Sequence, residues 1–227
     1  MPAALDINEV SRTIERLIKR ISERFPESGL RKIAEELHTV SLECADRSRY
    51  ISRPQITLRF GIGGLIALGT LLVLFALTQI AVKETYLLGE LVQITDATLN
   101  IAVLTGAGIF FLITVEIRIK RSRALESLNQ LRSIAHVIDM HQLTKDPAST
   151  LNPNPTPASP SRKLSVFELN RYLDYCAELL SLTGKIAAIF GQSLNDREVI
   201  AAANGIEDLT SNLSRKVWQK LGSLPVS

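Results

Sequence analysis

The sequence predicts an all-α membrane protein, with a two-span transmembrane hairpin and helical hairpins on the cytoplasmic side. Two apolar runs predict the spans: Phe60–Val82 has 23 residues and Ala97–Val115 has 19, and neither contains an acidic or basic side chain. About 20 helical residues cross the hydrocarbon core of a bilayer, so both runs are long enough. Elsewhere, apolar residues recur in steps of three and four, which is typical of amphipathic helices.

The charges around the two runs predict the orientation of the hairpin. We expect spans over residues 57–82 and 97–117, joined by a short extracytoplasmic loop, 83–96, with one lysine against three acidic residues. Both outer flanks are basic, with Arg47, Arg49, Arg53 and Arg59 before the first span and Arg118, Lys120, Arg121 and Arg123 after the second. Short basic segments stay on the cytoplasmic side. We therefore expect both termini in the cytoplasm.

Residues 1–52 are expected to form a cytoplasmic helical hairpin. Pro26 and Gly29 separate two apolar stripes, and Ser28 is the expected cap of the second helix. Two helices joined by so short a turn pack antiparallel. The stripes are Ile7, Val10, Ile14, Leu17 and Ile21, continued by Phe25, and then Leu30, Ile33, Leu37, Val40 and Cys44.

The second span is expected to continue as a cytoplasmic stalk helix over residues 118–143. This stretch contains neither Gly nor Pro, and a heptad stripe runs through Leu128, Leu131, Ala135 and Ile138. Residues 144–163 then contain five prolines among Ser, Thr and Asn, which predicts an extended linker. Pro157–Pro160 matches PxxP, so a proline-rich recognition peptide is the alternative to a plain spacer.

Residues 164–222 are expected to form a second cytoplasmic hairpin. Ser165 and Glu168 have the spacing of a capping box, and a turn is expected around Gly191–Asn195. Gly205 predicts a kink in the last helix, because glycine costs about 1 kcal/mol inside a helix. The two hairpins are expected to pack either on each other, as a four-helix bundle, or on other copies. The stripes are Leu169, Tyr172, Cys176, Leu179, Thr183 and Ile186, then Val199, Ala203, Ile206, Leu213 and Val217, with Trp218 beside them.

Composition and motifs argue against several functions. The net charge of +3 gives no reason to expect a nucleic acid partner. Cys44 and Cys176 fall on apolar stripes and predict two buried free thiols rather than a disulfide or a CxxC site. The chain has no GxxxxGK[ST], GxGxxG, HExxH or GxSxG motif. We therefore expect a protein that is not an enzyme and carries no cofactor.

The densest group of polar residues is His136, Asp139 and His141, at the end of the stalk. His141 lies five residues after His136, so a single helix cannot direct both imidazoles at one metal as an i, i+4 pair does. A metal site would need a ligand from another helix, such as His38. The alternative is a polar helix end, where histidine favours the C-terminal dipole.

Small, polar and basic residues in and beside the spans predict packing and lipid contacts. The pairs Gly63/Ala67 and Ala102/Gly106 have the small-xxx-small spacing of close helix contacts, within one hairpin or between copies. Glu116 is expected to pair with Lys120 or Arg59. The basic residues Arg118, Lys120, Arg121 and Arg123 are expected to face anionic lipid. A pore would use Thr70, Thr78, Gln79 and Asn100, and it would need an oligomer.

Two segments resemble parts of uncharacterised bacterial membrane proteins with two spans. They are LNQLRSIAHVIDMHQLTKDP, at Leu128–Pro147, and LNRYLDYCAELLSL. The resemblance implies a bacterial inner membrane and brings no activity or ligand. Because most residues outside the spans are committed to stripes that bury against other helices, we expect a membrane-anchored scaffold or adaptor that self-associates or recruits a cytoplasmic partner. The alternative is a homo-oligomeric channel or transport component built from such hairpins.

Overall fold

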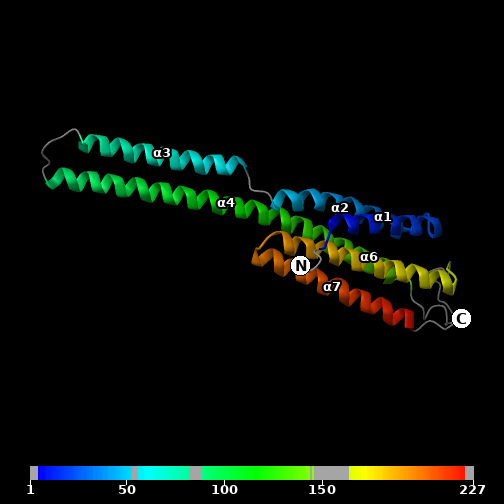
Figure 1. The fold of residues 1–227 in the computed structure, drawn as a ribbon. Helices are drawn as coiled ribbons and strands as arrows, with labels where there is room; N and C mark the ends of the chain where they lie inside the picture. Colours follow the sequence, from blue (N-terminus) through cyan, green and yellow to red (C-terminus); the bar gives the residue numbers. More distant parts are fainter. Residues whose placement is uncertain (1–4, 53–55, 82–87, 144, 146–163, 223–227) are drawn as a thin grey trace. The chain divides into compact units, whose positions relative to one another are not determined.

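The computed structural model describes residues 5–52, 56–81, 88–143, 145 and 164–222, and within these ranges every regular element is an α-helix (Figure 1). The chain divides into two compact units. We call residues 53–120 the hairpin, and residues 1–52 with 121–227 the bundle. The helices are α1 (Ile7–Arg24), α2 (Gly29–Ser52), α3 (Ile56–Ala81), α4 (Leu88–Leu143), α6 (Val166–Ser193) and α7 (Arg197–Gly222).

Side-chain caps fix the helix starts in the bundle. Asp6 accepts a hydrogen bond from the amide of Asn8 at the start of α1. The predicted cap Ser28 is confirmed, since its hydroxyl accepts from the amide of Arg31 at 3.2 Å. The capping box of α6 is also confirmed: Ser165 accepts from the amide of Glu168, whose carboxylate accepts from the amide of Ser165. These caps satisfy amides that have no partner inside the helix.

One continuous apolar core holds the bundle together. The predicted stripes of α1, α2, α6 and α7 are buried in it, and so are Leu128, Leu131, Ala135 and Ile138 of α4. The two predicted hairpins therefore pack on each other, and the Arg121–Leu143 part of α4 adds a fifth helix to the core. Cys44 and Cys176 are buried thiols that form no disulfide, as predicted.

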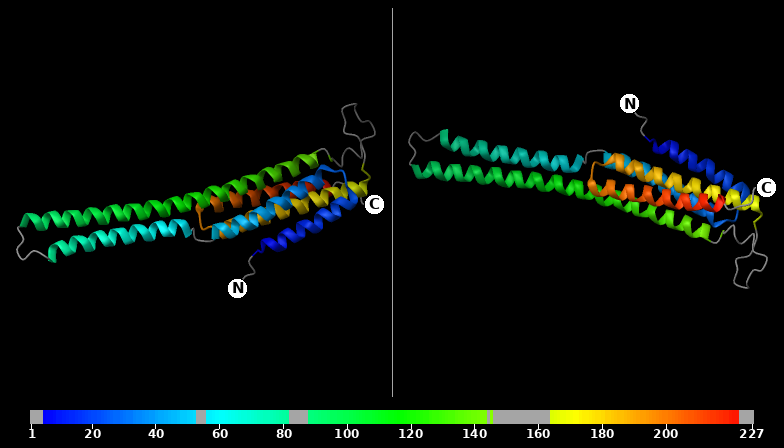
Figure 2. Two further views of the ribbon diagram at one scale, coloured as in Figure 1. Left: turned by 90° about the horizontal axis from the view of Figure 1, so that it is seen from above. Right: turned by 90° about the horizontal axis from the view of Figure 1, so that it is seen from below.

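Helix α6 lies at the centre of the bundle, between the α1–α2 pair and α7 (Figure 1). Fifteen of its 28 residues are buried, far more than one stripe provides. The bundle part of α4 runs along α7 in the same direction (Figure 2): Arg121 bonds Asp196 at the start of α7, and Lys220 near its end donates to the carbonyl of Gln142 at 3.0 Å. The partners of α6 are thus packed on several of its sides.

In the hairpin, α3 packs on the first part of α4 through small residues. A methyl group on Gly69 would lie 2.7 Å from Thr105 Oγ1, and one on Gly108 would lie 2.8 Å from Leu65 Cδ2. Within the described residues, one helical segment, Thr95–Leu143, is long and apolar enough to cross a membrane. Arg59–Phe75 in α3 is a shorter apolar segment, so the structure provides one candidate span where the sequence predicts two.

Two predicted boundaries are wrong. Residues 88–96 of the predicted loop are the first turns of α4, because no proline stands between Leu88 and the apolar run. Helix α6 continues to Ser193, so the turn before α7 is shorter than predicted. Helix α7 is continuous through Gly205, since its buried stripe continues on both sides of the glycine. Residues 144 and 146–163 of the predicted linker, with Pro157–Pro160, lie outside the described residues.

Candidate functional site

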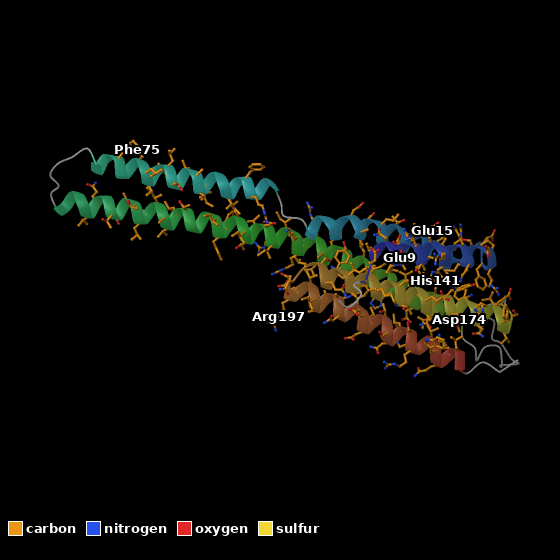
Figure 3. All side chains as sticks on the ribbon, viewed as in Figure 1. Glu9, Glu15, Phe75, His141, Asp174 and Arg197 are labelled. Atoms are coloured by element: carbon orange, nitrogen blue, oxygen red, sulfur yellow. The ribbon has the colours of Figure 1, made fainter. Side chains whose placement is uncertain are left out.

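A groove of about 690 Å³ runs along the seam between α6 and α7. On α6 it is bounded by Asp174, Glu178, Ser181 and Lys185, whose spacing of four, three and four places them on one helical face. This face is the side of the central helix that no other described helix covers. Figure 3 labels Asp174 among these side chains.

The α7 wall of the groove follows the same helical spacing, through Glu207, Ser211, Ser214 and Trp218. Trp218 is the one tryptophan of the chain, and it is 62% exposed. It was predicted to lie beside the buried stripe of α7, but in the structure it faces outward and lines the groove.

Small side chains let the two helices approach each other at the floor of the groove. A methyl group on Gly184 would lie 2.7 Å from Thr210 Oγ1 and 3.9 Å from Glu207 Cα. Thr210 is buried, and its hydroxyl donates to the carbonyl of Glu207 at 3.1 Å. The floor is therefore close-packed and offers shape rather than reactive groups.

The charge along the groove is predominantly negative, with three carboxylates against Lys185. Two carboxylates have partners: Glu178 pairs with Arg20 of α1, and Asp174 lies 3.5 Å from Arg171. Lys185 donates to the hydroxyl of Ser181 at 2.6 Å. Glu207 is exposed and makes no ion pair with any residue that the structure describes. The groove is lined by carboxylates, serines, one lysine and Trp218, with no histidine or cysteine among its described lining residues.

The predicted polar group at the end of α4 does not converge on one point. His136 is exposed, and the Asp139 carboxylate accepts a hydrogen bond from the side-chain Nε2 of Gln142 at 2.6 Å. His141 is half-buried against Gly29 of α2, and burial first, then the charge of Lys145, lowers the pKa of its imidazole. Among the described residues no three His, Cys, Asp or Glu side chains gather as metal ligands.

The thiol of Cys176 is a poor nucleophile. Burial raises the pKa of Cys176 to about 12, even though Lys220 and Lys145 oppose that shift. Burial also raises the pKa of its neighbour Tyr172 above the ordinary value. A thiol reacts as the thiolate, so Cys176 acts as a small core residue.

The small residues named from sequence spacing lie on the outer faces of the hairpin. Gly63, Ala67, Ala102 and Gly106 are all exposed, and a methyl group on Gly63 or Gly106 would meet nothing within 4 Å. Contacts inside the hairpin are made by Gly69 and Gly108 instead. The prediction that these four residues make close helix contacts within one hairpin is therefore wrong.

The basic residues after the apolar part of α4 divide into two kinds. Lys120 pairs with Glu116 at 2.8 Å, as predicted for that glutamate. Arg121 pairs with Asp196 at 2.8 Å and Glu198 at 3.0 Å. Arg118 and Arg123 are exposed. Lys120 and Arg121, which were predicted to face lipid, thus have acidic partners in the protein.

The groove was not predicted from the sequence, although two signals for it were present. The polar residues of α6 recur at the spacing of one helical face within an otherwise apolar helix. A tryptophan also stands in the polar last helix. A stripe of polar residues and a single aromatic residue also fit an ordinary surface, and the structure is needed to show that they share a seam.

Comparison with known proteins found no matching family model, no similar curated protein and no similar solved structure.

Proposed function

We propose that this chain is a membrane-anchored helical adaptor that is not an enzyme and that recruits a protein partner through its bundle. The observation that carries the proposal is the groove along α6 and α7, because it leaves one face of the central helix of a close-packed bundle accessible. Grooves between paired helices are common docking places for an amphipathic helix.

The anchor in this proposal is the hairpin. Its side chains Phe60, Leu71, Phe75, Phe110 and Phe111 are each more than 60% exposed, an arrangement that suits lipid and is costly in water. We infer that α3 and the first part of α4 both cross the bacterial inner membrane, with both termini in the cytoplasm. The basic flanks and the acidic 83–96 segment support this orientation.

A channel receives less support from the hairpin. The hydroxyls of Thr70 and Thr78 donate to the carbonyls of Ile66 and Phe75 in their own helix, at 2.8 Å each. Asn100 is within 3.4 Å of Asp96, one turn away on α4. Polar groups satisfied within one helix need no water-filled pore, which favours the adaptor.

The proposal is tested by purifying the full chain from membranes in mild detergent and identifying co-purifying proteins by quantitative mass spectrometry. The matched control is Leu179→Asp, which places a charge in the bundle core and leaves the hairpin unchanged. We expect at least one protein to be enriched with the native chain and lost with the variant. A chain that is monomeric by native mass spectrometry and enriches nothing over this control rules out the adaptor.

A further inference from the structure

We infer that the partner segment recognised by the α6–α7 groove is a cationic amphipathic helix, bound with Trp218 as its apolar anchor and Glu207 as its main charge contact. This inference rests on the proposed adaptor function and specifies the chemistry of the partner. It follows from the shape, the charge and the exposed aromatic residue of one groove.

The shape of the groove matches a helix. Its two walls run from Asp174 to Lys185 on α6 and from Glu207 to Trp218 on α7, eleven residues apart in each case. At 1.5 Å per residue, the walls are about 16 Å long, or about three helical turns. Two parallel ridges with a small-residue floor at Gly184 and Ala177 form a seat into which the side chains of a third helix fit. A docked helix would also cover the open side of α6.

The charge of the groove selects a basic ligand. Glu207 stands on the rim of the seam without an ion-pair partner in the described part of the chain, whereas Glu178 and Asp174 are paired with Arg20 and Arg171 and add little net charge, so Glu207 is the carboxylate open to a ligand. An acidic helix or a nucleic acid would bring like charge to these carboxylates. A lysine-rich polar face would complement them, and its apolar face would meet Ala177 and Trp218.

The exposure of Trp218 is the independent sign of a binding surface. Tryptophan is enriched among the residues that contribute most to protein interfaces, and it is rarely left open on a polar helix. Trp218 is 62% exposed at the end of the seam, whereas its neighbour Val217 is fully buried. An apolar side chain on the ligand would cover this ring.

The test uses a stapled helical peptide of about 18 residues with leucines on one face and lysines on the other, because short free helices are marginal in water. The full chain is held in nanodiscs of zwitterionic lipid, which avoids attraction of the peptide to anionic headgroups. Binding is measured by the anisotropy of a labelled peptide. A blue shift of the Trp218 emission is the second readout, since the chain has one tryptophan.

Two charge reversals on neighbouring residues separate the groove from the general surface. Glu207→Lys changes a groove residue, whereas Asp208→Lys makes the same change in net charge at an exposed position outside the groove. We expect Glu207→Lys to weaken binding by about five- to tenfold and Asp208→Lys to have an effect of about twofold or less. A peptide with glutamates in place of the lysines should prefer the Glu207→Lys protein.

Several results would overturn the inference. These are equal effects of the two reversals, binding without a Trp218 shift, and stronger binding of the acidic peptide to the native chain. A concentration-dependent Trp218 shift without peptide would assign the groove to a second copy and also overturn it. If the Glu207→Lys variant, purified from membranes, still enriches the same protein as the native chain, the inferred role of the groove is wrong but the proposed adaptor function stands. If nothing is enriched with the native chain, the adaptor itself fails.

Discussion

The imidazole of His141, near the end of α4, fills the space beside Gly29, the first residue of α2. A methyl group on Gly29 would overlap His141 Cε1 and would lie 3.0 Å from Nε2 and 3.1 Å from Nδ1. The backbone does not require glycine here, because no described residue has a positive φ. The requirement is space, and the contact joins the α1–α2 turn to the last turn of α4.

This contact predicts that Gly29→Ala lowers the free energy of unfolding of the bundle by about 1–2 kcal/mol, since the added methyl group must displace the ring. His141→Ala in the same chain should restore part of the loss, with a coupling of about 1 kcal/mol in a double-mutant cycle. Chemical denaturation followed by Trp218 fluorescence measures all four proteins. Additive effects of the two substitutions would show that the ring and the glycine do not interact.

His141 also predicts how bundle stability depends on pH. Its pKa in the folded protein lies below the ordinary 6.5, first because of burial and then because of Lys145. Below pH 6.5 the unfolded chain therefore binds more protons than the folded one, and stability falls as the pH decreases through the folded pKa. Thermal unfolding at about pH 7.5 and about pH 5.5 should show a smaller difference for His141→Asn than for the native chain. His136→Asn, at an exposed position of the same helix, is the matched control, and an equal change in both variants would contradict the assignment.

Asp196 is predicted to stabilise the start of α7 in two ways. Its carboxylate accepts from the amides of Glu198 and Val199, at 3.0 and 3.3 Å, and from Arg121 at 2.8 Å. We expect Asp196→Ala to cost about 2 kcal/mol in the free energy of unfolding, and Asp196→Asn to cost less because asparagine still caps a helix. Glu198→Ala, at an exposed pair with the same arginine, should cost about 0.5 kcal/mol or less.

The dependence of bundle stability on pH in the acidic range tests the role of Asp196. Burial raises the pKa of Asp196, but the hydrogen bonds from Arg121, Val199 and Glu198 outweigh burial, and the pKa lies below its ordinary value. The stabilisation is therefore present at neutral pH and is lost as the pH falls through the folded pKa. In the Asp196→Asn variant, the free energy of unfolding should therefore depend less on pH in the acidic range. A native and a variant chain with parallel profiles would show that the carboxylate charge contributes little.

Heptad spacing was sufficient to predict which faces of the bundle helices are buried, because burial of one apolar face dominates the stability of such helices. It could not predict the neighbours of each face. The stripe through Leu128 and Ile138 fits an isolated stalk, a coiled coil between copies or a fifth bundle helix equally well. In the structure these residues are buried in the bundle core, as a fifth helix. In α6, the burial of Leu173, Leu180 and Phe190 outside the predicted stripe reflects a helix that is apolar almost all round.

Residue spacing also could not predict which small residues of the hairpin make contacts between its two helices. Spacing of four places Gly63 with Ala67, and Ala102 with Gly106, on single faces, but it does not tell an inner face from an outer one. Gly69 and Gly108 belong to no such pair that the sequence analysis named, yet they are the ones whose missing side chains accommodate Thr105 and Leu65. Only the packing of α3 on α4 distinguishes them.

The inner and outer faces of the hairpin can be separated by a disulfide between Leu65→Cys and Gly108→Cys, two positions that lie in contact. Because Cys44 and Cys176 are buried, alkylation after unfolding and intact mass measurement report whether the new pair has formed. Gly69→Leu should lower the yield about fivefold or more, since the leucine would overlap Thr105. Gly106→Leu should leave the yield unchanged, because a side chain there meets open space. Equal losses would mean that both glycines face the partner helix. An unchanged yield in Gly106→Leu combined with a smaller oligomer would show that this outer face pairs one copy with another.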